Sequence, residues 1–338
     1  MAAYSTASPS FTERPPAVRF ALNLLRSRLE PGEIAIDVPL ATLGRWRIGG
    51  PADVVVTPCS VAALGRALAS VADAGAPYVV IGDGSNLLFA DDGFRGVVIR
   101  VSRTFGDFQS SDDVVDAGAG LWVPCFVRRV IDLGLAGATH AIGVPGTLGG
   151  LVTMNGGSQR RGIGENVVYV DALDRQGALH RIDQAELHYR YRASRLQQGD
   201  LIVVSTRFRF APGDRHALQQ EAIDILAARR AKFPRVRANC GSVFVSDPDL
   251  YALIGPPGLA IERAGLKGRA IGGAQISPEH ANFIVNNGDA RAEDVLRLIG
   301  LARRRIAEIW GVWMDAEVRH LASDGTMRPA HQAVPDRA

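Results

Sequence analysis

The sequence is poor in cysteine, in aromatic residues and in long apolar runs. Its three cysteines, Cys59, Cys125 and Cys240, are far apart, odd in number and form no CxxC pair, so we expect neither a disulfide framework nor a zinc site. The seven histidines show no HExxH spacing, and no bound metal is expected. No apolar run approaches the roughly 18 residues that cross a membrane, and the polar, proline-containing start does not resemble a secretory signal. These absences favour a protein of the reducing cytoplasm with no membrane partner.

Strong charge of either sign is also missing. The net charge is +3, and charged residues make up 22% of the 338 residues. Lys232 and Lys267 are the only lysines, and the arginines are interspersed with acidic residues. Because nucleic-acid-binding proteins usually concentrate basic residues on one face, we expect no nucleic-acid partner. Hydrophobic residues reach 47%, which is enough for a substantial core, and the length indicates two or three domains.

Local patterns predict both helices and strands, with a change of character near residues 211–214. Ser60 suits the N-cap of one helix, and Pro234 stops another. Helices are predicted over 18–29, 61–74, 121–134, 215–232 and 292–310, and strands over 78–81, 97–101, 167–173, 178–182 and 201–210. We expect a tail with a short helix over 1–33, a first domain over 34–212 that divides near residue 103, a second domain over 213–325 and a flexible tail over 326–338.

Two glycine-rich segments are the strongest local candidates for a ligand site. Residues 82–88 read GDGSNLL directly after a predicted strand, and residues 143–150 read GVPGTLGG, with Asn-Gly-Gly at 155–157. Glycines allow sharp turns and let backbone amides approach an anion, so the two segments could hold the two ends of a pyrophosphate. Neither matches GxGxxG before a helix or GxxxxGK[ST]. The residues alone predict a nucleotide or flavin site, with tight turns in a sheet protein as the alternative.

Several motifs, in order, resemble those of the UDP-N-acetylenolpyruvoylglucosamine reductase family, whose members make a peptidoglycan precursor. In the first half these are RIGGPAD at 47–53, GDGSNLLF at 82–89 and VPGTLGG at 144–150 with Met-Asn at 154–155. In the second half they are YRAS at 191–194, GSVF at 241–244, AGLKG at 264–268, GGAQ at 272–275, HANFIVN at 280–286 and AEVR at 316–319. The resemblance covers about residues 38–320, and the ordered set is more specific than any one motif.

The resemblance implies an α+β fold. A two-subdomain FAD-binding domain of the vanillyl-alcohol-oxidase (PCMH) type would be followed by a C-terminal α+β substrate domain. It further implies non-covalent FAD, NADPH as electron donor, and reduction of the enolpyruvyl ether of UDP-N-acetylglucosamine to UDP-N-acetylmuramate. In that reaction flavin N5 gives a hydride to C3 and a proton goes to C2. The interval between Arg192 and Ser242 has no room for the substrate-capping insertion of one subtype, so the chain resembles the shorter subtype. We expect a monomer or weak oligomer.

Three residues are implied to be catalytic. Arg192 would bind the substrate carboxylate through two parallel hydrogen bonds, Glu317 would act with it on the developing charge, and Ser242 would donate the proton. Without the resemblance, Arg192 would be assigned to a solvated strand face, Ser242 to a turn, and Glu317 to a surface ion pair with Arg319.

The resemblance also implies binding residues. The cofactor contacts would be Arg47, Gly82, Asp83, Gly84, Ser85, Asn86, Leu87, Gly143, Val144, Pro145, Gly146, Thr147, Gly149, Gly150 and Asn155. The substrate contacts would be Tyr191, Lys232, Gln275 and Asn282. For Lys232 the alternative is a cation that interacts with the dipole at a helix C-terminus. A covalent flavin link through His140 is not expected.

Two segments depart from the usual family sequence. Residues 156–162 read GGSQRRG where the family usually has AGAYG, and residues 245–248 read VSDP, followed by the unfamiliar insert 251–258, where the family continues into Lys-Asn-Pro. These departures leave two alternatives open. One is a divergent flavin reductase of the same fold that acts on another enol ether or activated alkene, and the other is a flavin- or nucleotide-binding module without catalysis.

Overall fold

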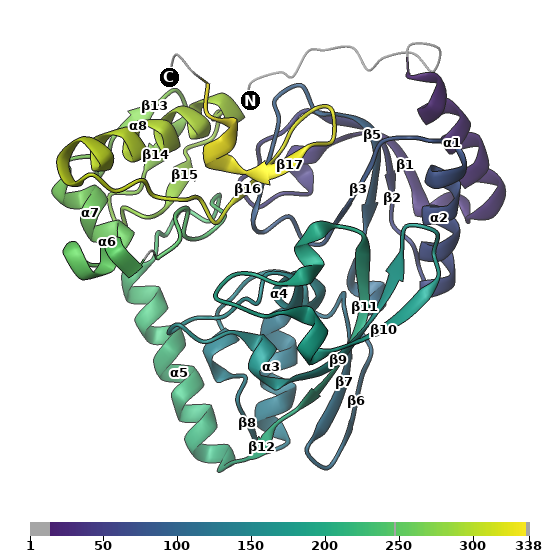
Figure 1. Cartoon of the computed structure of the whole chain (residues 1–338), viewed down its shortest axis with the longest axis horizontal. Coiled ribbons are helices and arrows are strands. Elements are labelled where there is room, and N and C mark those ends of the chain that lie inside the picture. The colour runs from purple at the N-terminus through teal and green to yellow at the C-terminus, as the bar shows by residue number, and fades with distance from the viewer. Residues whose placement is uncertain (1–13, 247, 336–338) are drawn as a thin grey trace.

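The computed structural model describes residues 14–246 and 248–335 and arranges them in three parts around a common centre (Figure 1). Two parts come from the N-terminal two thirds of the chain, and each is built on one sheet with helices against it. The third part lies after the long helix α5 (Arg215–Lys232). None of the helices in the described ranges is both long enough and apolar enough to cross a membrane.

The first part is a four-stranded sheet covered by two helices. The strand order is β1-β2-β5-β3, in which β2, β5 and β3 run parallel and β1 is an antiparallel edge. The hydroxyl of Ser60 accepts a hydrogen bond from the Ala63 amide, so it caps the second helix as predicted. Buried leucines of both helices share one core with the sheet. The elements are α1 (Pro16–Arg28), β1 (Ile34–Pro39), β2 (Pro51–Val56), α2 (Val61–Asp73), β3 (Tyr78–Ile81) and β5 (Phe94–Arg100).

The second part is a five-stranded antiparallel sheet in the order β10-β9-β11-β7-β6. Alternation along β11 explains its two faces: Phe208 is fully buried, whereas Arg207 pairs with Asp116 at 2.7 Å on the other face. Phe126 of α3 packs on Phe208, with ring centroids 5.0 Å apart. The elements are β6 (Phe108–Ser111), β7 (Val114–Gly118), α3 (Val123–Asp132), β8 (Leu135–Ala136), α4 (Leu148–Thr153), β9 (Val167–Asp174), β10 (Leu179–Asp183), β11 (Leu201–Arg209) and β12 (Ala211–Pro212).

The third part packs α8 on a small antiparallel sheet, and it has a core of its own. Apolar residues spaced three or four apart, among them Val295, Leu298 and Ile306, form the buried face of α8. The elements are α6 (Pro248–Leu253), α7 (Pro257–Arg263), β13 (Ala270–Ile271), β14 (Ala274–Ile276), β15 (Ile284–Asn286), α8 (Ala292–Trp310), β16 (Arg319–Leu321) and β17 (Met327–Pro329).

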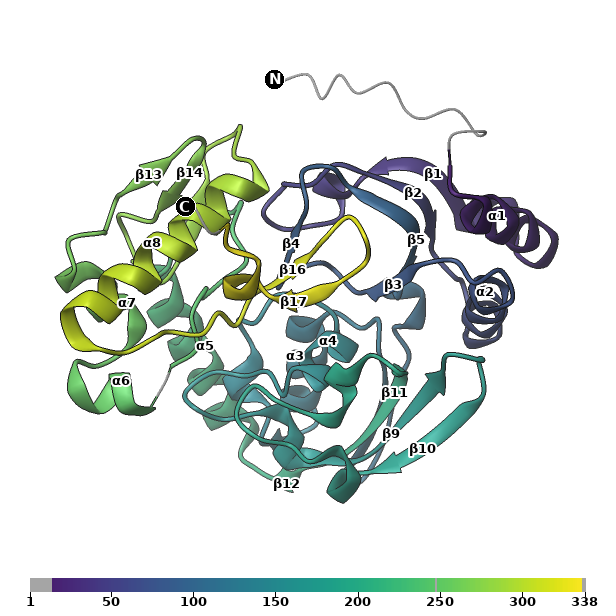
Figure 2. The ribbon, with the colours of Figure 1, turned by 45° about the horizontal axis from the view of Figure 1, so that its top comes forward.

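A C-terminal strand pairs with a strand from the first hundred residues of the chain. Strand β16 pairs in parallel with β4 (Leu87–Phe89), which directly follows the first glycine loop (Figure 2). The side chain of Trp46 adds a second link, because its indole nitrogen donates to the carbonyl of Ile284 at 2.8 Å. These contacts place the third part against the first glycine loop.

Most predicted elements are present, and the differences are instructive. The helices predicted over 215–232 and 292–310 have those bounds. Helix α4 was not predicted, because it begins within a glycine-rich loop whose local sequence indicates turns. Residues 326–335 are not a flexible tail, because β17 pairs with β16 and Ala330 is fully buried. The predicted N-terminal tail over residues 1–13 lies outside the described residues.

Candidate active site

A cavity of about 790 Å³ lies where the three parts meet. Both glycine loops line it, and so do the side chains of Arg192, Ser242 and Glu317, which come from distant parts of the chain. Of the predicted cofactor contacts, those that line the cavity are Gly82, Asp83, Gly84, Ser85, Asn86, Leu87, Val144, Pro145, Thr147, Gly149 and Gly150. The fold therefore brings the two glycine loops and the three predicted catalytic residues to one space.

The two glycine loops touch each other. A Cβ atom on Gly82 would overlap the hydroxyl of Thr147, and a Cβ atom on Gly146 would lie 2.5 Å from the hydroxyl of Ser85. Gly146 also has a φ of +123°, which disfavours other residues. Glycine thus allows the close approach of the loops at both positions, and at position 146 it also allows the backbone conformation.

The loops also leave backbone amides unpaired. Within the described part of the chain, no hydrogen bond is formed by the amides of Asp83, Gly84 and Ser85 in the first loop or by those of Gly146 and Gly150 in the second. Polar backbone groups of folded proteins rarely remain without a partner. Because amides at such turns suit anions, the paired loops fit the diphosphate of a dinucleotide such as FAD.

Arg192 and Glu317 form an ion pair at the cavity wall. The Nε atom of Arg192 lies 2.9 Å from Oε1 of Glu317, and both side chains are largely buried. The two terminal nitrogens of Arg192 donate to the carbonyls of Asn155, at 3.3 Å, and Gly157, at 2.6 Å. Arg192 has a φ of +55° and lies in a turn. The plain alternatives, a solvated strand face for Arg192 and an Arg319 pair for Glu317, are therefore wrong.

The Glu317 carboxyl group has a perturbed acidity. Burial raises the pKa of Glu317 above its usual value, and the adjacent Arg192 charge offsets part of this rise. Its backbone is fixed from two sides, because the Glu317 amide donates to the Val243 carbonyl at 2.8 Å and the Asn86 side chain donates to the Glu317 carbonyl at 3.1 Å. A carboxyl group with a raised pKa is suited to accept or release a proton during a reaction.

Ser242 lies on the segment beside Glu317. An antiparallel bridge joins Phe244 to Ala316, so the serine and the glutamate follow adjacent stretches of backbone. The side chain of Asn282 bonds both backbone groups of Phe244, at 2.9 and 3.0 Å. Gly241, with a φ of +80°, turns the chain just before the serine. The Gly241 amide donates to the Asn239 side chain at 3.0 Å and the Val243 amide donates to the Asn282 carbonyl at 2.8 Å, so hydrogen bonds fix the backbone on both flanks of Ser242.

The remaining predicted cofactor residues, Arg47, Gly143, Gly146 and Asn155, do not line the cavity. Arg47 is exposed in a turn with a φ of +57°. Gly143 lies against the side chain of Arg229. The Asn155 side chain accepts from the amide of Gly164 at 2.9 Å, while its carbonyl holds Arg192.

The four predicted substrate residues do not line the cavity. Tyr191 is 44% exposed, and its ring centroid lies 4.9 Å from the Arg192 guanidinium carbon. Lys232 is exposed at the end of α5. The Gln275 side chain donates to the Gly268 carbonyl at 3.0 Å, and Asn282 is buried against Phe244.

Several residues of the cavity wall were not predicted. Arg319 and Phe283 fall inside motifs that the sequence singled out. Arg229 and Phe233 belong to no motif: Arg229 lies in the last turn of α5 and Phe233 directly follows that helix. The guanidinium carbon of Arg229 lies 4.5 Å from the Phe233 ring centroid. Cys240 also lines the cavity, and burial raises the pKa of its thiol to about 12.

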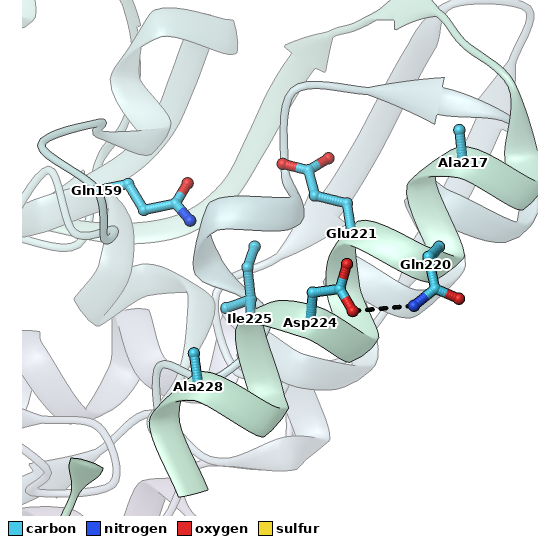
Figure 3. A pocket seen from close by; sticks show the side chains of 7 residues that line it. All are labelled: Gln159, Ala217, Gln220, Glu221, Asp224, Ile225 and Ala228. Carbon is cyan, nitrogen blue, oxygen red and sulfur yellow. Dashed lines mark hydrogen bonds between the residues drawn. The ribbon is translucent and has the colours of Figure 1, made fainter. Parts of the chain in front are cut away.

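A second hollow, of about 580 Å³, lies on the surface of α5 (Figure 3). It is lined by Gln159, Ala217, Gln220, Glu221, Asp224, Ile225 and Ala228. None of the predicted site residues is among them. Within residues 14–246 and 248–335, no cluster of three or more His, Cys, Asp or Glu side chains could hold a metal ion.

Known protein families account for both halves of this architecture. A model of an FAD-binding domain matches residues 52–183, which include both glycine loops, so the fold and the site define an FAD-dependent protein. The model of the C-terminal domain of UDP-N-acetylenolpyruvoylglucosamine reductase matches residues 233–321.

Whole-chain comparisons name the family. The chain is 45% identical over 303 residues to UDP-N-acetylenolpyruvoylglucosamine reductase 1 of Corynebacterium glutamicum, with 90% of each chain covered. It is 42% identical to the reductase of Heliobacterium modesticaldum over 85% of this chain and 90% of that one. The crystal structure of the Thermus caldophilus reductase is similar with a TM-score of 0.71 and 32% identity, and 85% of this chain and 99% of that chain are covered. The chain belongs to the UDP-N-acetylenolpyruvoylglucosamine reductase family, which confirms the predicted family and α+β class.

Proposed function

We propose that this chain is the FAD-dependent reductase that converts the enolpyruvyl ether of UDP-N-acetylglucosamine to UDP-N-acetylmuramate, with NADPH as electron donor. The observation that carries the proposal is the convergence of Arg192, Ser242 and Glu317 on the cavity that the paired glycine loops line. The domain limits, the cytoplasmic location, the monomeric or weakly oligomeric state and the absence of nucleic-acid or membrane partners remain predictions from the sequence.

The amides of the two glycine loops would hold FAD, and the bound cofactor would supply hydride transfer from NADPH to the alkene. The guanidinium of Arg192 has five N–H groups. Three of them point to Glu317 and to the carbonyls of Asn155 and Gly157. Donors therefore remain on its terminal nitrogens for the substrate carboxylate, where they would stabilise the negative charge that develops. The Arg192–Glu317 pair keeps the guanidinium in one orientation.

Ser242 is the proposed proton donor to C2. A serine hydroxyl is a weak acid, so the role demands a strongly basic, carbanion-like acceptor and a fixed position. The hydrogen bonds on both flanks of Ser242 supply that position. Tyr191 and Lys232 directly precede the cavity-lining residues Arg192 and Phe233 in the sequence, and they are proposed to contact the bound sugar nucleotide.

The test begins with the absorption spectrum of the purified protein, with and without NADPH, followed by NADPH oxidation with the enolpyruvyl sugar nucleotide. We expect Ser242→Ala to keep flavin reduction by NADPH but to slow reduction of the sugar nucleotide by about a hundredfold or more. Ser27→Ala, on the exposed face of α1, is the control and should match the parent. Equal turnover of Ser242→Ala and parent would refute the proton-donor role.

A divergent reductase that acts on another enol ether is the second candidate. The two segments that depart from the family sequence contact each other, because the guanidinium carbon of Arg160 lies 4.1 Å from the Tyr251 ring centroid. Genetic complementation of a strain that lacks the cell-wall enzyme separates the candidates, since rescue would count against the divergent substrate. A flavin that NADPH does not bleach would instead favour a non-catalytic module.

A further inference from the structure

His140 is a fully buried polar side chain to which the proposed reaction assigns no part. It lies in a single helical turn, Thr139–Ala141, just before the second glycine loop, and its exposed fraction is 0%. Among the described residues, neither ring nitrogen has a hydrogen-bond partner of good geometry, although the nearby Gly137 carbonyl favours the charged form. Burying a polar ring without good partners costs free energy, so its contacts deserve a functional explanation.

The ring of His140 packs against a segment that departs from the family sequence. A Cβ atom on Gly157 would lie 2.6 Å from Nδ1 of His140, and it would also overlap the carbonyl oxygen of Arg161. The Ser158 hydroxyl donates a hydrogen bond to the His140 carbonyl. Both the side chain and the backbone of His140 therefore contact the first residues of this segment.

The residues that follow need support, because their backbone is strained. Gln159 and Arg160 have φ values of +55° and +62°, in the left-handed region that favours glycine. Conformations of this kind persist only where the surrounding structure holds them. The contacts of His140 with Gly157 and Ser158 hold the chain directly before the two strained residues.

The supported segment carries a carbonyl group that orients Arg192. A terminal nitrogen of Arg192 donates to the Gly157 carbonyl at 2.6 Å, while Nε of Arg192 lies 2.9 Å from the Glu317 carboxylate. Gly157 and Arg192 line the cavity, whereas His140 lies behind Gly157 and is not among the lining residues. A shift of Gly157 would therefore turn the remaining N–H groups of the guanidinium away from a bound carboxylate.

The His140 ring is uncharged at neutral pH. Burial is the main cause, and it lowers the pKa of His140 to about 4. The positive charges of Arg161 and Arg192 act in the same direction, and Glu165 opposes them. A neutral ring can pack beside the segment that holds Arg192 without repelling the guanidinium.

We propose that His140 is a positioning residue, which holds the peptide group between Gly157 and Ser158 so that Arg192 points at the substrate carboxylate. The inference rests on the proposed function. It also gives the departing segment a role, because this segment links a buried histidine to the arginine of the site.

The test compares His140→Ala and His140→Phe with His216→Ala in the two halves of the reaction. Phenylalanine retains a flat, uncharged ring, and His216 is a control histidine that is exposed in the first turn of α5. Stopped-flow absorbance follows the reduction of bound FAD by NADPH and then its reoxidation by the sugar nucleotide.

We expect His140→Ala to slow reoxidation by about ten- to hundredfold, as for a misplaced binding group, and to leave reduction by NADPH at the parent rate. His140→Phe should retain most of the reoxidation rate, and His216→Ala should match the parent. In an Arg192→Lys background, His140→Ala should slow reoxidation little further, because the histidine acts through the arginine.

Equal reoxidation rates of folded His140→Ala and parent would overturn the inference. Equal slowing of both half-reactions would overturn it too, since that result marks a general structural role. If the alanine variant does not fold, Ser158→Ala decides the matter. Loss of its hydrogen bond to the His140 carbonyl should slow reoxidation by about two- to tenfold, and an unchanged rate would count against the inference.

Failure of the proposed function would appear separately, as a parent protein that NADPH reduces but the sugar nucleotide does not reoxidise. The inference is then judged by urea unfolding. The losses of stability in His140→Ala and Arg192→Lys should not add in the double variant, because the two side chains hold the same peptide group. Additive losses would overturn the inference.

Discussion

Replacing Asn282 by alanine tests whether this residue supports the site or contacts the substrate. The sequence predicts a substrate contact, whereas in the structure the Asn282 side chain is buried and bonds both the amide and the carbonyl of Phe244. The alanine variant would leave the buried amide and carbonyl of Phe244 without these partners. It would also loosen the segment that carries Ser242, two residues earlier.

The magnitude follows from the two lost hydrogen bonds. An unsatisfied buried polar group costs about 1–3 kcal/mol, so the amide and carbonyl of Phe244 together predict a loss of about 2–6 kcal/mol in the free energy of unfolding. Turnover should fall as well, because Ser242 would no longer be held in one position. The KM for the sugar nucleotide should change less than kcat.

Urea unfolding followed by circular dichroism measures the first effect, and steady-state kinetics measures the second. Asn287→Ala is a matched control, because Asn287 is exposed and its side chain donates only to Gln275 at 3.2 Å; its loss should stay below about 0.5 kcal/mol. A variant at position 282 with unchanged stability and a raised KM would refute the structural reasoning and favour direct substrate contact.

Three further predictions concern the loops and the titratable groups. Gly146→Ala should weaken FAD binding much more than Gly75→Ala in a titration of apoprotein, since both positions have positive φ but only Gly146 abuts the other loop; similar losses would contradict the pairing of the loops. Because the pKa of Glu317 is raised, the native state binds its proton more tightly than the unfolded state, so the parent should lose stability relative to Glu317→Gln as pH rises above about 4; a difference that is constant in urea unfolding from pH 4 to 8 would be inconsistent with this. Iodoacetamide should label the exposed Cys59 in the folded protein and Cys240 only after unfolding, and equal labelling rates would show that the Cys240 thiol is accessible.

The site depends on contacts between parts of the chain that are far apart in sequence. Strand β16 pairs with β4, and the backbone of Glu317 bonds both Asn86 and Val243. A disturbance at any of these three places would therefore reach the Arg192–Glu317 pair. The pairing of β17 with β16 ties residues 327–329, which the sequence predicts to lie in a flexible tail, to the same region.

The sequence by itself determined the elements whose signals are local. The apolar spacing of α8, the Ser60 cap of α2 and the alternation in β11 each predict their element, because helix and strand periods place apolar residues on one face. The order of the motifs likewise identified the family, and with it FAD and the reaction class. Helix α4 was not predicted, because its glycines indicate turns. Only packing against the sheet overrides that local preference.

Tertiary structure alone decided which side chains meet. Nothing in the sequence spacing joins Arg192 to Glu317, and nothing marks Arg229 as a cavity residue, since both facts depend on how three separately packed parts come together. The same packing turned Asn282 inward against the backbone and brought both glycine loops to one cavity. Local sequence sets backbone preference, whereas long-range contacts form only when distant apolar surfaces are buried against one another.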